Sequence, residues 1–132
     1  MSHRPVWSGL KLETLRLDAH LGWGSEERSK TQAVDLDVWV RFPEIPLACT
    51  TDELDQTVCY SQLAGAAQGV VRERSFRLVE ALAYELFAAL RTRLPGGSEL
   101  WIQVKKVNPP VSGLKGGASI CLGTEYFADR WS

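Results

Sequence analysis

The chain has 132 residues, enough for one domain with a single core, and its 45% hydrophobic and 23% charged residues are typical of a soluble globular protein. A net charge of -1, with no dense run of Lys or Arg, gives no electrostatic basis for binding nucleic acid or an anionic membrane. No apolar run approaches the roughly 20 residues that cross a bilayer, and the N-terminus has no signal-peptide core, so we expect a cytoplasmic protein.

Cysteine and histidine are too few and too scattered for a metal site or a disulfide framework. The three cysteines, Cys49, Cys59 and Cys121, are far apart and form no CxxC pair. The only histidines are His3 and His20. We therefore expect reduced thiols and no metal.

The first third of the chain predicts two paired strands. Apolar residues alternate over residues 10–19, and the parity changes across Glu13 and Thr14, which indicates a β-bulge. A second alternation over residues 33–42 predicts a half-buried strand antiparallel to the first. The charged loop between them, residues 22–31, is too long for a tight hairpin, and such loops are uncommon unless they have a function.

Residues 43–56, with two prolines and an acidic run, predict an irregular segment before the first helix. That helix is expected from about Ser61 to Arg74. Its expected inner face is rich in small side chains and comprises Leu63, Ala66, Ala67, Val70 and Val71.

Residues 76–90 carry the clearest helical pattern in the chain. Their apolar stripe comprises Val79, Leu82, Ala83, Leu86 and Leu90. Ser75 is the expected N-cap, and Pro95 follows the C-terminal end. Glu80 lies at the margin of the stripe, bordering the core near the positive end of the helix dipole. A carboxylate there either complements the dipole alone or also binds a ligand.

Residues 99–107 predict a third strand with one lysine aimed inward. Leu100, Ile102 and Val104 share a face, and the period of two places Lys106 on that face and Lys105 on the other. An ammonium at the end of a core-facing row is costly unless it is paired or opens into a cleft. The alternative is that the strand ends by Val104 and both lysines are solvated.

Residues 118–122 predict a fourth strand, followed by a tail that contains Tyr126, Phe127 and Trp131. The order strand, strand, helix, helix, strand, strand indicates an α+β fold with an antiparallel sheet. Such a sheet leaves open edges, and open edges favour pairing between subunits, so we expect a ring-like homo-oligomer.

Four motifs, each weak alone, together resemble the dihydroneopterin aldolase family in order and spacing. They are residues 22–28 (GWGSEER) with Gln32, Asp52 with residues 57–60 (TVCY), residues 76–83 (FRLVEALA), and residues 106–110 (KVNPP). The resemblance implies one tunnelling-fold domain over residues 1–132, with its core at about 9–123. In that fold, sheets from several subunits form a barrel with the helices outside, here as a tetramer or octamer. It also implies a pterin site between adjacent subunits, with neither a metal nor an organic cofactor.

The resemblance also implies roles for individual residues. Glu80 would anchor the amino-pyrimidine edge of a pterin, with a backbone contact from Val79. Thr57 and Val58 would contact the pterin ring, and Tyr60 would reach the substrate from a neighbouring subunit.

Lys106 matches the acid–base lysine of the family, and Glu27 matches the glutamate beside the substrate's hydroxylated side chain. The implied activity is that of an aldehyde-lyase in folate biosynthesis. It cleaves 7,8-dihydroneopterin by a retro-aldol reaction to 6-hydroxymethyl-7,8-dihydropterin and glycolaldehyde, without a Schiff base.

Three departures from the family pattern border the implied site: Cys59 before the tyrosine, Thr31 before Gln32, and Leu21 before Gly22. Cys59 is either a nucleophile or a buried structural thiol. Zinc-dependent relatives of the fold are disfavoured because the chain has only two histidines.

Two other functions stay open. A 2'-epimerase of dihydroneopterin or its triphosphate would use largely the same residues and would gain from a basic pocket, for which Arg28 with Lys30, or Lys115, is a candidate. A non-catalytic pterin-binding ring protein would keep Glu80 but lose Lys106 or Tyr60, and both are present.

Overall fold

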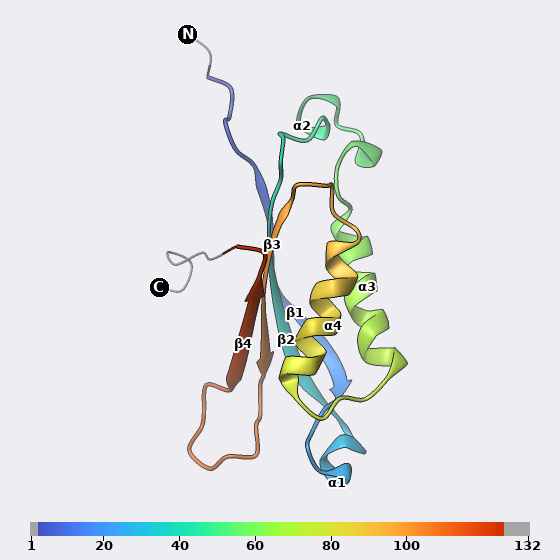
Figure 1. Cartoon of the computed structure of the whole chain (residues 1–132), viewed down its shortest axis with the longest axis vertical. Helices are drawn as coiled ribbons and strands as arrows, with labels where there is room; N and C mark the ends of the chain where they lie inside the picture. Colours follow the sequence, from blue (N-terminus) through green and yellow to red (C-terminus); the bar gives the residue numbers. More distant parts are fainter. Residues whose placement is uncertain (1–2, 126–132) are drawn as a thin grey trace.

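The computed structural model describes residues 3–125, which form a four-stranded antiparallel sheet in the order β1-β2-β3-β4 with two helices on one face (Figure 1). The strands are β1 (Gly9–His20), β2 (Thr31–Arg41), β3 (Glu99–Lys106) and β4 (Ala118–Gly123). The helices are α1 (Ser25–Arg28), α2 (Ala48–Thr51), η1 (Leu54–Gln56), α3 (Tyr60–Glu73) and α4 (Val79–Arg91). The α+β class and the order of the main elements are confirmed. The predicted tail residues Tyr126, Phe127 and Trp131 lie outside the described residues.

The predicted bulge in β1 is confirmed. Pairing of β1 with β2 shifts register between Leu12 and Leu15. Thr14, inside the shift, has a left-handed φ of 55°, and its N–H donates to Asp37 Oδ1 over 2.6 Å. The bulge restores the inward alternation, so that Leu17 and Ala19 are buried beside β2.

The core lies between the sheet and the two long helices. α3 packs on β1 and on α4, and α4 packs on β3 and β4. The predicted α4 stripe is confirmed: Leu82, Ala83, Leu86 and Leu90 are buried, and Val79 is half-buried. On α3, Leu63, Ala67 and Val71 are buried. None of the helices within residues 3–125 is long and apolar enough to span a membrane.

The predicted N-cap of α4 is wrong. The cap position is Leu78, which is extended (φ -124°, ψ 142°), and no side chain caps the helix. The cause lies two residues upstream, where Phe76 pairs with the end of β1. Its N–H donates to the His20 carbonyl over 2.8 Å, and its carbonyl accepts from Gly22 N–H over 3.0 Å. This bridge holds the backbone extended past Ser75, so the helix begins later.

Two segments predicted as irregular contain single helical turns. The loop after β1 includes α1, and residues 43–56 include α2 and η1. Turns of three or four residues bury no side chains here and leave no periodic apolar pattern in the sequence.

Candidate active site

Lys106, the last residue of β3, faces the helices and is paired. It lies opposite Val34 of β2, on the same face as Val104, which lies opposite Leu36. Its Nζ is 2.8 Å from Glu27 Oε2, and the two side chains are 14% and 29% exposed. The prediction from strand parity is confirmed. The alternative, a strand ending by Val104 with two solvated lysines, is wrong.

Glu27 is placed by the backbone of the loop that carries it. A Cβ added at Gly22 would collide with the Glu27 carboxylate, so the absence of a side chain at Gly22 lets the carboxylate lie against the chain. Arg28 closes the loop: its Nη1 donates to the carbonyls of Gly22 (2.9 Å) and Trp23 (2.6 Å). The Arg28 carbonyl is 2.8 Å from His20 Nδ1. The loop is therefore fixed at both ends around the carboxylate.

Gln32, at the start of β2, supports the same carboxylate. Its Nε2 donates to the Leu21 carbonyl and, over 3.4 Å, to Glu27 Oε2. Its Oε1 is buried and has no hydrogen-bond partner among residues 3–125. Gly22 and Gln32 belong to the first family motif, but no role was predicted for either residue. The available signal was their position at the two ends of the unusually long loop between β1 and β2.

The pKa of Glu27 is held below its usual range. The main cause is the hydrogen bond from Lys106; the hydrogen bonds from Gln32 and from the Trp23 backbone act in the same direction, and partial burial opposes them. Glu27 is therefore ionised at neutral pH. Its oxygens can accept hydrogen bonds from hydroxyl groups as well as from Lys106.

An open hollow of about 500 Å³ lies beside Glu27. It is lined by Glu26, Glu27, Lys30, Thr31, Gln32 and Asn108. The lining offers carboxylate, amide, hydroxyl and ammonium groups, which suit a small hydroxylated group better than an apolar one. Lys30, suggested by the sequence as part of a basic pocket, therefore lies beside two glutamates.

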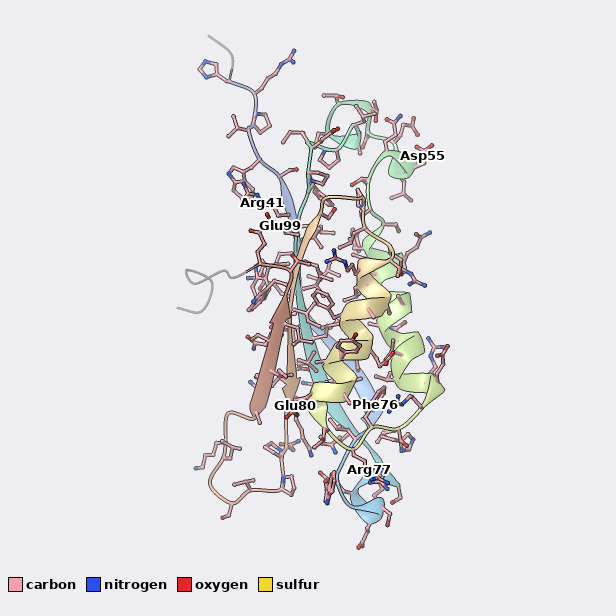
Figure 2. The ribbon with its side chains drawn as sticks, in the orientation of Figure 1. Arg41, Asp55, Phe76, Arg77, Glu80 and Glu99 are labelled. Atoms are coloured by element: carbon pink, nitrogen blue, oxygen red, sulfur yellow. The ribbon has the colours of Figure 1, made fainter. Side chains whose placement is uncertain are left out.

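Glu80 lies in the first turn of α4 and is exposed, so the expectation that it borders the core is wrong for the single chain. It lies at the same end of the molecule as Phe76 and Arg77 (Figure 2). The Phe76 bridge to Leu21 joins the start of α4 to the loop that carries Glu27. The single chain thus places Lys106, Glu27 and Glu80 toward one end of the sheet, and the Glu80 side chain is exposed.

Val79 precedes Glu80 at the start of α4, whereas Thr57, Val58 and Tyr60 lie toward the opposite end. Thr57 and Val58 line a groove of about 610 Å³ together with residues 42–46 and 92–96. Tyr60 begins α3 and is 63% exposed. In Figure 2 Asp55, just before them, lies in the upper part of the molecule and Glu80 lies in the lower part. The 14 residues of α3, about 21 Å of helix, separate Tyr60 from the Lys106 end.

Within the described part of the chain, no three His, Cys, Asp or Glu side chains are grouped as a metal ion would require. Cys59 is half-buried at the N-cap of α3 and so lies at the Tyr60 end, away from Lys106.

Comparison with known proteins gives the family. The dihydroneopterin aldolase (FolB) family matches residues 10–122. The chain belongs to the dihydroneopterin aldolase family. A probable dihydroneopterin aldolase of Chlamydia pneumoniae is 31% identical over 106 residues, covering 80% of this chain and 79% of that protein. A Streptococcus pyogenes dihydroneopterin aldolase is 30% identical over 104 residues, covering 77% and 85%.

Solved structures of the dihydroneopterin aldolase family share the fold. A Vibrio cholerae structure described as a FolB aldolase superposes with a TM-score of 0.77 at 21% identity, covering 90% of this chain and 98% of that one. Escherichia coli dihydroneopterin aldolase, solved in complex with neopterin, gives 0.74 at 19% identity, covering 89% and 99%. A Burkholderia aldolase structure, bound to guanine, gives 0.72 at 16% identity, covering 92% and 93%.

Proposed function

We propose that this family member cleaves 7,8-dihydroneopterin by a retro-aldol reaction to 6-hydroxymethyl-7,8-dihydropterin and glycolaldehyde. The observation that carries the proposal is the Lys106–Glu27 pair, 2.8 Å apart, with Glu27 lining an open hollow, in a chain of the dihydroneopterin aldolase family. The neopterin and guanine bound by two structural relatives both carry a 2-amino-4-oxo-pyrimidine edge, which supports a site for that edge here.

The chemistry requires proton transfer and positioning. A C=N bond of the dihydropterin ring lies next to the side chain and can take the electron pair released when the carbon–carbon bond breaks, so no lysine Schiff base is required. Lys106, in its neutral amine form, would accept the proton of the 2'-hydroxyl, through a water, as that carbon becomes the aldehyde. Tyr60 would return a proton to the enamine carbon. General acid–base catalysis of this kind contributes roughly 10²- to 10⁴-fold.

Glu27 would orient the substrate's side-chain hydroxyls. Its carboxylate is ionised, fixed against Gly22 and already hydrogen-bonded to Lys106. Gln32 Nε2 donates to the same carboxylate over 3.4 Å and helps to hold it in place. A substrate hydroxyl that donates to Glu27 would be held close to Lys106, because the two side chains are in contact.

Glu80 would bind the flat end of the substrate. A carboxylate can accept two parallel hydrogen bonds from the 2-amino group and the adjacent ring N–H of a pterin. The backbone of Val79, in the uncapped first turn of α4, would add a contact beside it.

We further propose that the complete site contains residues of two subunits. Thr57, Val58 and Tyr60 lie a helix length from Lys106, so they can serve this site only from a neighbouring molecule. Both edge strands, β1 and β4, have an unpaired side within the described sheet. Pairing β1 of one subunit with β4 of the next would extend the sheet toward the barrel of the tunnelling fold and a tetrameric or octameric ring.

The test is to incubate the purified protein with 7,8-dihydroneopterin and to assay both glycolaldehyde and the substrate isomers. Release of glycolaldehyde supports the aldolase. Conversion between isomers without release supports the 2'-epimerase. A protein that binds neopterin and does neither is a non-catalytic pterin-binding ring protein.

A further inference from the structure

A second hollow, of about 430 Å³, lies between the loop after β1 and the connection from α3 to α4. Its lining contains three arginines, Arg28, Arg74 and Arg77, together with Trp23 and Ser75, and no acidic residue. We call it the arginine pocket. It shares no lining residue with the hollow beside Glu27 and Lys106.

Each guanidinium is held by contacts that leave other N–H groups available. Arg28 donates from Nη1 to two loop carbonyls. Arg74 donates from Nε to the Ser75 carbonyl over 3.2 Å, and it lies over the Phe76 ring at 4.2 Å from the centroid. Arg77 lies 5.7 Å from the Trp23 ring centroid and points toward the α1 end (Figure 2). In the part of the chain that the structure describes, none of the three forms an ion pair.

Three cations around one pocket repel one another unless an anion lies between them. Guanidinium groups match the oxygens of a phosphate, because each presents parallel N–H donors in a rigid fork. We infer that the arginine pocket binds a phosphate-class anion, with Arg28, Arg74 and Arg77 as its ligands. The anion is either a phosphate group on the substrate's side chain or a separate phosphate compound.

The pocket borders both halves of the proposed pterin site. Arg28 follows Glu27 in α1, and Leu78 and Ala81 of its lining flank Glu80 in sequence. We therefore expect that a pterin bound by Glu27 and Glu80 can extend a phosphate into the arginine pocket. Phosphate binding is measured without turnover. A failure to bind phosphate can therefore be distinguished from a failure to catalyse the proposed reaction.

The experiment titrates inorganic pyrophosphate into the full-length protein by calorimetry. We expect binding by the wild type, and a loss of at least about tenfold in affinity for Arg74→Ala and for Arg77→Ala, since each removes a charge-assisted hydrogen bond. Arg77→Lys keeps the positive charge but loses the parallel N–H donors of the guanidinium. Its pyrophosphate affinity should lie between that of the alanine variants and that of the wild type. The matched control is Arg72→Ala: Arg72 is exposed, donates to the Gln68 carbonyl and does not line the pocket.

Three results would overturn the inference: no pyrophosphate binding by wild type, unchanged affinity in both Arg74→Ala and Arg77→Ala, or an equal loss in Arg72→Ala. The last would show a general charge effect. Circular dichroism of each variant identifies misfolding, and because Arg77 is exposed, its two variants keep the test valid if Arg74→Ala loses its packing on Phe76.

A second arm distinguishes the two sources of phosphate by comparing neopterin with neopterin triphosphate. If the phosphate belongs to the substrate, the triphosphate binds more tightly and Arg77→Ala removes the gain. If it belongs to a separate compound, the triphosphate gains nothing and pyrophosphate binds equally with and without neopterin. Both results support an anion site in the arginine pocket. The proposal is contradicted if neopterin triphosphate binds more tightly than neopterin and both Arg74→Ala and Arg77→Ala keep that difference.

Discussion

Lys106 Nζ lies 2.8 Å from Glu27 Oε2, and this contact joins the last residue of β3 to a single helical turn after β1. The acid and the amine come from opposite ends of the sequence, and neither is fully buried. Each side chain is therefore the electrostatic partner of the other and is also accessible to a substrate. Substitutions at and around this pair can test substrate binding, proton transfer and stability one at a time.

Lys106→Ala should lower kcat by roughly 10²- to 10⁴-fold, because it removes the proposed proton acceptor. Neopterin affinity should change little, since Glu80 is untouched. Lys105→Ala is the matched control: Lys105 is adjacent, but it lies on the other face of β3, opposite Asp35. Steady-state assays and neopterin titrations measure both quantities. Turnover by Lys106→Ala at the wild-type rate would contradict the mechanism.

Glu27→Gln should lower stability in a pH-dependent way. The folded-state pKa of Glu27 is lowered below the unfolded value of about 4.3, so its contribution is fully present above that value and is lost as pH falls through the folded pKa. The difference in unfolding free energy between wild type and variant should be largest near neutral pH and should shrink below roughly pH 4. Urea denaturation at several pH values measures it. Glu26→Gln, which removes the neighbouring exposed carboxylate, is the control; a difference that grew on acidification would be the wrong sign.

Glu80→Gln should weaken neopterin binding by roughly 10- to 100-fold, because hydrogen bonds to a charged acceptor become bonds to a neutral amide. Glu85→Gln, on the exposed face of the same helix, should bind as wild type does. Fluorescence titration with neopterin gives both affinities. Equal binding by the two variants would remove Glu80 from the site.

Gly22→Ala should lower kcat by about tenfold or more while the protein stays folded, because the new methyl group displaces the Glu27 carboxylate from its position beside Lys106. Gly24→Ala tests the same loop at a position where an added Cβ meets nothing within 4 Å. Steady-state assays compare the kcat values of the two variants, and thermal melts check that both variants are folded. Similar activity in both variants would show that Glu27 does not need its observed position.

Mixtures of Lys106→Ala and Tyr60→Phe subunits should recover activity that neither variant has alone. The proposed site takes Lys106 from one subunit and Tyr60 from its neighbour, so mixed oligomers contain some sites with both groups intact. Unfolding and refolding the two variants together, followed by glycolaldehyde assay, measures recovery. A mixture that stays as inactive as its components would place both residues in one subunit's site or remove Tyr60 from catalysis.

Local periodicity was enough for much of the fold. The apolar stripe of α4 and the alternation of β2 follow from helical and strand geometry, and the parity of β3 correctly chose Lys106 over Lys105. The family motifs also selected Lys106 and Glu27, which the folded chain brings into contact. These features depend on residues within a few positions of one another, or on a repeated pattern.

The sequence by itself therefore determined the four strands, the two long helices, their order and the family. Only the tertiary structure decided where α4 begins, because a backbone bridge from Phe76 to Leu21 overrides the local capping preference of Ser75. The tertiary structure also decided how Gly22 and Gln32 position Glu27. It brings Arg28, Arg74 and Arg77 to one pocket, although the sequence has no dense run of basic residues. Helix and strand patterns depend on residues close in sequence, so they can be predicted from the sequence. Contacts between distant segments form only when the whole core is packed.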